Sequence, residues 1–484
     1  PRSRVKLFLI KRKGAGSRAL AITMNAIMDT ARRRRRTDAP PPPGKEESSD
    51  ARAHFLAGPD ASSTSKHSPS DDASRHLSLG DREAIRAPSQ HQAPRPPLKR
   101  ERQPERSLFP MSNLRNMAPF RYDIVGSFLR PARLKEARAR HLQGELSKEA
   151  LTEVENEEIA ALIAKEKAVG LKAVTDGEFR RRSWHLDFLA GLRGLTVYEF
   201  ESTGFGVKTK ALGTYVSSTL DFDPAHPFLD HFRFTQEQAG ADATAKQTIP
   251  GPNMIYLDAV ILSKQYAAHP VYRDHDAFVA DLARTYQDAI QAFYDAGCRY
   301  LQLDDTSWGA LFSESFRQRI QDCGYDPDAL IPQFADITRQ ALAKRPDDMA
   351  ITMHMCKGNF KSHWLYEGRY DTIASHLLGI DNFDGFFLEY DDERSGGFEP
   401  LTHLHKQKIV LGLMTTKKGD LESKDDLIAR IREAERYVPL EQICISPQCG
   451  FSSTLDGNDL PEEAQWKKLA LLKETADEVF GEGC

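Results

Sequence analysis

Two residues that can bind a metal, His354 and Cys356, lie two positions apart in this sequence. In an extended strand alternate side chains share one face, so the imidazole and the thiol can reach the same point. An imidazole and a thiolate together suit a borderline-soft cation such as zinc. Glu389 and Cys449 would supply one oxygen and a second sulfur. These four residues therefore predict a tetrahedral Zn²⁺ site.

Each of the four candidate ligands also has an ordinary structural interpretation. His354 can be a hydrogen-bonded core residue, and Cys356 can be a small buried hydrophobic side chain. Glu389 can cap a helix or form an ion pair. The metal site is the favoured interpretation because all four residues fall at the predicted ends of strands, on one rim of the fold.

Acidic residues lie at the ends of two further predicted strands. Glu178 follows one strand, and Asp304 and Asp305 close another. Carboxylates paired at the mouth of a site suit a cation such as a substrate ammonium group. The structural alternatives are helix capping by the two aspartates and an ion pair between Glu178 and Arg180, Arg181 or Arg182.

Short apolar runs alternate with longer segments of helical periodicity, which is typical of repeated βα units and a parallel sheet. The strands are predicted over 122–126, 172–176, 246–250, 299–304, 350–354, 385–390, 408–413 and 442–446. Helices are predicted over 148–170, 276–297, 327–344 and 424–437. Gly170 and Gly297 lie where two of these helices should end.

These units predict a single (β/α)8 TIM barrel, whose active site would lie at the C-terminal ends of the strands. An open doubly wound sheet is the alternative, but the first strand-to-helix turn has no Gly-rich phosphate loop. Residues 191–245 are too many for a βα loop, so we predict a β-hairpin insertion over the barrel mouth.

The first 117 residues differ in composition from the rest of the chain. They contain 24 Lys and Arg against 12 Asp and Glu, and 13 of the 27 prolines. Such a segment buries too little apolar surface to offset its ordering entropy. We therefore predict a disordered, basic, Pro-rich tail over 1–117 and the barrel domain over 118–484. The run Arg32–Arg36 could bind nucleic acid or belong to an organelle transit peptide, but a low-complexity arm is the preferred interpretation.

The apolar runs and the cysteine content of the chain indicate in which cellular compartment the protein is expected. No window of 18 consecutive apolar residues is present, so we predict no membrane span. Six cysteines in a long chain without a secretory signal predict reduced thiols and a cytoplasmic protein, with organelle targeting by the tail as the alternative. Because the sequence begins with Pro1, we expect a fragment or an upstream extension, with Met111 or Met117 as the natural start.

Taken in order, these motifs resemble the catalytic barrel of cobalamin-independent methionine synthase, and more closely the short, single-barrel methyltransferases of that family. The resemblance extends over most of residues 120–480. The matching segments are 124–128 (IVGSF), 175–178 (TDGE), 301–304 (LQLD), 352–356 (TMHMC), 387–389 (FLE) and 446–450 (SPQCG). The resemblance implies that the catalytic zinc is bound by His354, Cys356, Glu389 and Cys449.

The resemblance also implies where an amino-acid thiol would bind. Its carboxylate would lie at the backbone around Val125, Gly126 and Ser127, and its ammonium group at Glu178 and Asp304, which would count as catalytic residues. A free thiol has a pKa above 8, and coordination to zinc deprotonates it. The activated sulfur would then attack a methyl group held in line with it.

The chain departs from the family in two places. A tail replaces the second, N-terminal barrel that helps to bind polyglutamylated folate in the full-length enzymes. Lys417 lies near the position of the family's proton-donating His. A lysine can act as a general acid only if its pKa is depressed; otherwise it holds an anion or is a solvated loop residue. Three tryptophans could stack on a flat pterin or be ordinary packing: Trp184, Trp308 and Trp364.

The function predicted from these residues is zinc-dependent S-methylation of a thiol, homocysteine, with methyltetrahydrofolate or a related donor, to form methionine. The alternatives are a related zinc barrel that uses another thiol, of the coenzyme M type, or cleaves a thioether, and a noncatalytic zinc-stabilised barrel. The expected partners are a small thiol and a methyl donor, with no nucleic acid for the barrel and no membrane. The sequence leaves open the donor, the proton donor and a homo-oligomeric state.

Overall fold

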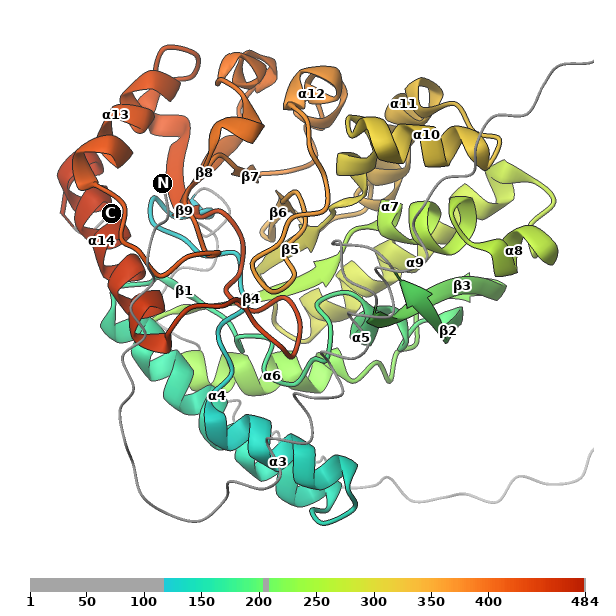
Figure 1. The fold of residues 1–484 in the computed structure, drawn as a ribbon, viewed down its shortest axis with the longest axis horizontal. Coiled ribbons are helices and arrows are strands. Elements are labelled where there is room, and N and C mark those ends of the chain that lie inside the picture. Colours follow the sequence, from blue (N-terminus) through green and yellow to red (C-terminus); the bar gives the residue numbers. More distant parts are fainter. Residues whose placement is uncertain (1–116, 203–208, 483–484) are drawn as a thin grey trace, which may run out of the picture. The chain divides into compact units, whose positions relative to one another are not determined.

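A curled sheet of seven parallel strands forms the centre of the described part of the chain (Figure 1). The computed structural model describes residues 117–202 and 209–482. Neighbouring strands are hydrogen-bonded in the order β1 (Ala173–Val174), β4 (Thr244–Pro250), β5 (Tyr300–Asp304), β6 (Ala350–Met355), β7 (Gly385–Glu389), β8 (Lys408–Met414) and β9 (Ile443–Pro447). The strands are buried along almost their whole length, as expected of a parallel sheet covered by helices. The predicted α/β barrel is confirmed.

The predicted strand 122–126 is an extended segment that closes this barrel. Tyr122 forms an isolated parallel bridge with Ile445 of β9. At the other end of the segment the Phe128 N–H donates to the Gly177 carbonyl beyond β1, at 3.1 Å. The segment therefore lies between β9 and β1 without forming a regular ladder.

Side chains on β4 and β5, and one directly after β1, explain the missing ladder. The carbonyl of Ile124 accepts from the Lys246 ammonium group at 2.5 Å, and the carbonyl of Val125 accepts from the Gln302 amide at 2.8 Å. The hydroxyl of Thr175 donates to the Gly126 carbonyl at 2.6 Å. Acceptors that would pair with a strand backbone are thus bound by side chains instead.

Helices surround the sheet (Figure 1). The four predicted helices are present as α4 (Lys148–Ala168), α9 (His275–Asp295), α11 (Pro327–Ala341) and α13 (Lys424–Ala434). Gly170 and Gly297 have φ of 88° and 101° just beyond α4 and α9, where only glycine adopts the left-handed region without strain. The other longer helices are α3 (Ala132–Leu142), α6 (Phe228–Ala239), α10 (Glu314–Asp322) and α14 (Glu462–Phe480).

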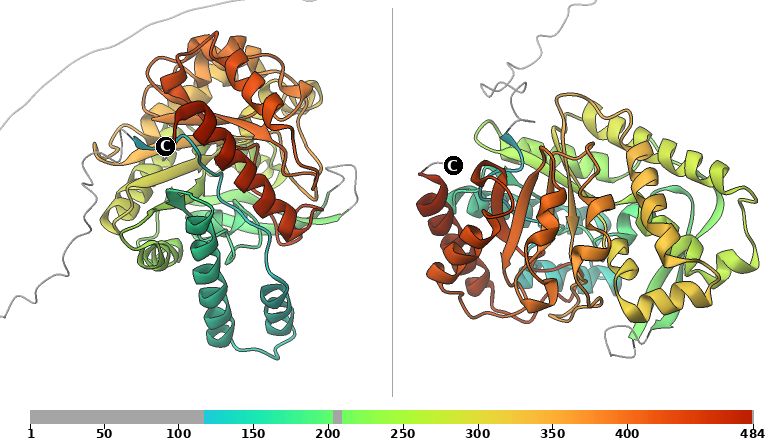
Figure 2. Two further views of the ribbon diagram at one scale, coloured as in Figure 1. Left: turned by 90° about the vertical axis from the view of Figure 1, so that its left-hand side faces the viewer. Right: turned by 90° about the horizontal axis from the view of Figure 1, so that it is seen from above.

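Short helices fill the remaining connections. They are α5 (Leu186–Leu189), α7 (Pro252–Met254), the π-helix η3 (Ile255–Ile261), α8 (Lys264–Ala268), η4 (Ser307–Leu311), η5 (Tyr370–Thr372), α12 (Ala374–Leu377), η6 (Glu393–Ser395), η7 (Glu399–His403) and η8 (Leu440–Gln442). Figure 2 shows α3 and α4 lying side by side as a helical pair that extends away from the sheet.

The predicted β-hairpin insertion is confirmed as the antiparallel pair β2 (Arg193–Ser202) and β3 (Thr209–Asp221). It packs against η3, α8 and α9. The prediction treats all of 191–245 as hairpin, whereas α6 occupies its second half. Phe228, Phe232 and Thr235, at the helical spacing i, i+4, i+7, are buried on one face of α6.

The predicted tail lies outside the described residues except for Met117, so its disorder stays a prediction. Within 117–202 and 209–482, every helix is too short or too polar to cross a membrane.

Candidate active site

Three of the four predicted metal ligands come together at the C-terminal end of the barrel. His354 lies on β6, Cys356 directly follows β6, and Cys449 lies in the loop after β9. One ligand atom from each residue lies within 4.8 Å of the other two, and all three side chains are buried. Both ring nitrogens of His354 are buried without a hydrogen-bond partner among the described residues. This donor set, two sulfurs and one unpaired imidazole, fits Zn²⁺.

The three residues of this group shift one another's pKa values. The neighbouring thiol of Cys356, and then His354, lower the pKa of Cys449 well below its ordinary value. The hydrogen bond to Cys449, together with burial, raises the pKa of Cys356 well above its ordinary value. Burial alone would lower the pKa of His354, but its neighbour Cys449, and then the charges of Asp304 and Glu389, raise it. Metal binding at these three residues would require both thiols and the imidazole to be deprotonated.

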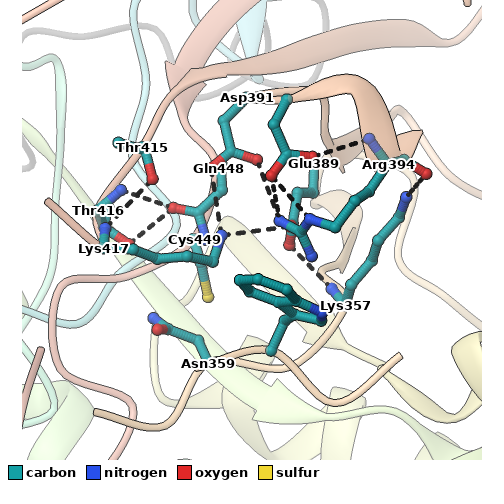
Figure 3. Close-up of polar contacts among 12 residues, drawn as sticks. Lys357, Asn359, Glu389, Asp391, Arg394, Thr415, Thr416, Lys417, Gln448 and Cys449 are labelled. Atoms are coloured by element: carbon teal, nitrogen blue, oxygen red, sulfur yellow. Dashed lines mark hydrogen bonds and ion pairs between the residues drawn. The ribbon is translucent and has the colours of Figure 1, made fainter. Parts of the chain in front are cut away.

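Glu389, the fourth predicted ligand, lies beside this group but is held by cations (Figure 3). Its carboxylate is fully buried. Oε2 accepts from the Lys357 backbone N–H at 2.9 Å. Oε1 accepts from the Arg394 guanidinium at 3.0 Å and from the Lys417 ammonium group at 3.3 Å. In this arrangement three donors occupy the carboxylate that the sequence assigned to a metal.

Lys417 is a buried residue rather than a solvated loop lysine. It is 7% exposed and bridges Glu389 and Asp391, the latter at 3.2 Å (Figure 3). Burial lowers the pKa of Lys417, but the two carboxylates outweigh it and raise the pKa above the ordinary value. These contacts match the alternative in which Lys417 holds an anion, and its role as a proton donor stays a prediction.

Glu178 and Asp304 face the same mouth, each with one oxygen held by a neighbour. Glu178 Oε1 accepts from the Thr248 hydroxyl at 3.1 Å, whereas Oε2 is buried without a partner anywhere in 117–202 and 209–482. Asp304 Oδ1 accepts from the Gln302 amide at 2.6 Å. Burial raises the pKa of Glu178 to about 7 and that of Asp304 to about 6. A cation between them would favour the ionised form of both.

The backbone at Val125, Gly126 and Ser127 offers donors for an anion. All three residues are buried. The carbonyls of Val125 and Gly126 accept from Gln302 and Thr175, and that of Ser127 accepts from the Phe451 N–H at 2.9 Å. No hydrogen bond from the N–H groups of the three residues occurs in the described part of the chain. Buried, unpaired N–H groups in succession are unusual and suit a carboxylate. The Ser127 hydroxyl is already engaged, since it accepts from the Ser452 N–H at 3.2 Å.

Other predicted residues have structural roles. Asp305 Oδ1 accepts from the N–H of Ser307, the first residue of η4, at 3.1 Å, as in the capping alternative. Trp308 is fully buried and its ring is perpendicular to that of Phe334, which is the ordinary-packing alternative. Trp184 is tilted against His185 with ring centroids 4.5 Å apart.

Trp364 differs from the other two tryptophans because it is 42% exposed. The Arg394 guanidinium covers one of its faces, 4.2 Å from the ring centroid. Its other face can still offer aromatic surface to a ligand.

The sequence prediction missed an arginine that joins the two halves of the site. Arg130 donates to the Glu178 carbonyl at 2.8 Å and the Arg181 carbonyl at 3.1 Å. It also donates to the carbonyls of Ser452 and Thr454 at 2.8 and 3.0 Å, in the loop that carries Cys449. Only its position two residues after the matched IVGSF segment could have drawn attention to it.

Comparisons with known proteins show to which family the chain is related. The family model described as "Cobalamin-independent synthase, Catalytic domain" matches residues 229–464. The uncharacterized protein YxjH of Bacillus subtilis is 47% identical over 371 residues, covering 75% of this chain and 95% of that protein. The methionine synthase of Saccharolobus solfataricus is 24% identical over 330 residues, covering 68% of this chain and 87% of that protein.

A solved structure indicates the same family. A Listeria monocytogenes protein, a candidate vitamin-B12-independent methionine synthase, is 40% identical, with a TM-score of 0.60. The similarity covers 75% of this chain and 99% of that chain. Relatives at 40% and 47% identity are thus matched over almost their whole length. The chain belongs to the cobalamin-independent methionine synthase family and is a methyltransferase.

Proposed function

We propose that this methyltransferase is zinc-dependent and methylates homocysteine to methionine. One observation carries the proposal: the trio His354, Cys356 and Cys449, which could hold a metal ion, and the acids Glu178 and Asp304 share one barrel mouth. The trio suits a thiol-activating metal, and the acids suit an ammonium group. Homocysteine carries both a thiol and an ammonium group.

The chain's own residues would bind and orient this substrate. The N–H groups of Val125, Gly126 and Ser127 would bind its carboxylate, and Glu178 and Asp304 its ammonium group. This leaves the thiol directed toward the trio, because His354 is the strand neighbour of Asp304. Burial of these groups excludes water and strengthens each electrostatic contact.

His354, Cys356 and Cys449 would hold the metal, with Glu389 as the predicted fourth ligand. The bound ion would lower the pKa of the substrate thiol so that it reacts as a thiolate. Two thiolates from the protein make the site electron-rich, which keeps a bound sulfur nucleophilic. The proposal that Glu389 binds the metal requires that it leave Lys417 and Arg394.

The methyl donor is proposed to be methyltetrahydrofolate or a related small molecule. The alternative thiol, of the coenzyme M type, carries a sulfonate and no ammonium group, so it gains nothing from Glu178 and Asp304. A noncatalytic barrel does not agree with membership of a methyltransferase family.

The test combines metal analysis with product formation. Purified protein would be analysed for zinc by mass spectrometry, and methionine formation from homocysteine would be followed with monoglutamyl methyltetrahydrofolate, polyglutamyl methyltetrahydrofolate and methylcobalamin. We expect about one zinc per chain and methionine with at least one donor. Stoichiometric zinc without product from any donor would overturn the homocysteine proposal.

A further inference from the structure

Arg181 is a buried arginine in the barrel mouth whose guanidinium is fixed on several sides. It is 2% exposed. One terminal nitrogen donates to the carbonyl and the hydroxyl of Thr248, both at 2.8 Å. The other donates to the Trp184 carbonyl at 3.1 Å and to Glu178 Oε1 at 3.3 Å. The Phe228 ring lies 4.7 Å below the guanidinium carbon. The side chain therefore has one fixed position.

The Glu178 carboxylate is held on one side only. Thr248 and Arg181 both donate to Oε1, whereas Oε2 has no partner within the described ranges. The backbone is constrained as well, because Glu178 has φ of 59°, a conformation that costs energy for any residue other than glycine. Its N–H donates to Asp176 Oδ1 at 2.8 Å, and Arg130 binds its carbonyl.

We propose that Arg181 is a positioning residue for substrate binding: together with Thr248 it holds Oε1 of Glu178, so that Oε2 accepts a hydrogen bond from the substrate ammonium group. The inference rests on the proposed function, since it requires an amino-acid thiol. Arg181 acts through Glu178 and does not touch the substrate.

Charge explains why an arginine occupies this position. Burial raises the pKa of Glu178 to about 7, Arg181 and Arg130 lower it, and Asp304 and Asp176 raise it. These are the neighbouring charges that affect the pKa of Glu178 most. Without Arg181, a larger fraction of Glu178 would be protonated at neutral pH and would lose its attraction for an ammonium group.

The experiment compares two thiols that differ in the amino group. Zinc-loaded protein would be titrated calorimetrically with L-homocysteine and with 4-mercaptobutyrate, which keeps the thiol and carboxylate but lacks the amine. We expect Arg181→Met to weaken homocysteine binding about 10- to 100-fold and to change 4-mercaptobutyrate binding less than about 3-fold, since a hydrogen bond to a charged group is worth ~1.5–3 kcal/mol.

Two further variants keep the test valid if Arg181→Met folds poorly. Arg181→Lys keeps the charge but cannot reach Thr248 and Glu178 together. Thr248→Val conserves volume and removes the hydroxyl that binds Oε1. We expect both variants to weaken the binding of homocysteine selectively over that of 4-mercaptobutyrate. The loss of affinity should be smaller than in Arg181→Met.

The controls separate positioning from folding. Arg182→Ala changes an exposed arginine next in sequence and should leave both affinities unchanged. Arg130→Lys disturbs hydrogen bonds to backbone carbonyls and should weaken the binding of both thiols to the same extent. In the wild type the preference for homocysteine should fall as the pH drops through about 7, and in Arg181→Met this fall should move to higher pH.

The possible outcomes test the positioning role of Arg181 and the proposed function separately. If Arg181→Met weakens both thiols equally, Arg181 is only structural and the positioning proposal is overturned, while the proposed function stands. If the wild type binds 4-mercaptobutyrate as tightly as homocysteine, the ammonium group is not recognised, and both proposals are overturned.

Discussion

Asp304 of β5 and His354 of β6 are register partners in the parallel sheet. A hydrogen bond from the next residue stabilises this pairing, because the Asp305 N–H donates to the His354 carbonyl at 2.8 Å. Burial raises the pKa of Asp304 to about 6, and His354 opposes that rise. The acid proposed for the substrate ammonium group and the imidazole proposed for the metal are thus fixed side by side by the sheet itself.

Asp304→Asn tests the acid without changing its size. The amide oxygen can still accept from Gln302, so the fold should be kept, but the negative charge is lost. We expect KM for homocysteine to rise about 10- to 100-fold with zinc content unchanged, as for the loss of a charge-assisted hydrogen bond. The exposed Asp336→Asn on α11 is the matched control. Loss of zinc from Asp304→Asn would instead place Asp304 in the metal site.

Cys449→Ser tests the metal site. The hydroxyl of serine is a poor ligand for zinc at neutral pH, so the site would lose a thiolate. We expect zinc to fall from about one per chain to a small fraction after desalting, and methyl transfer to be lost with it. Cys323→Ser, which changes an exposed thiol, should retain metal and activity. Full zinc content in Cys449→Ser, measured by mass spectrometry, would contradict the proposed ligand set.

The pH dependence of substrate binding follows from the two acids. Burial raises the pKa of Glu178 to about 7 and that of Asp304 to about 6, and only the ionised forms attract an ammonium group. Affinity for homocysteine should therefore be highest above pH 7 and fall as the pH drops through 7 and then 6. Steady-state measurements of KM for homocysteine between pH 5.5 and 8 check this expected fall in affinity.

Glu178→Gln supplies the internal check for this pH profile. The variant should lose the transition near pH 7 and keep the one near pH 6. An unchanged profile would show that Glu178 does not titrate in substrate binding.

The sequence could predict what depends on strand ends and short spacing. The strand over 350–354 carries the HxC pair, so His354 and Cys356 follow from the alternation of side chains in a strand. Cys449 joins them because the barrel closes and brings β9 to the same rim. These relations depend on topology, and topology can be read from periodicity.

The surroundings of Glu389 could not be predicted in the same way. Its partners Arg394 and Lys417 come from η6 and from the loop after β8, where no periodic pattern fixes side-chain positions. Whether Glu389 binds a metal or pairs with basic side chains depends on which groups the three-dimensional fold places beside it. Arg181 was considered only as one of three arginines that could pair with Glu178, because sequence spacing alone does not distinguish Arg180, Arg181 and Arg182.

Lys417→Met tests whether Lys417 acts by holding Glu389 or by donating a proton. The substitution would leave Glu389 and Asp391 buried without one of their cations, and breaking such a pair costs about 3–5 kcal/mol. We expect a comparable fall in the free energy of unfolding in urea. Lys418→Met, which changes the exposed neighbour, should alter it by less than about 0.5 kcal/mol. A general acid would give the opposite pattern, with stability kept, kcat lost and the basic limb of the kcat profile removed. That result would return Lys417 to the catalytic role that its sequence position suggests.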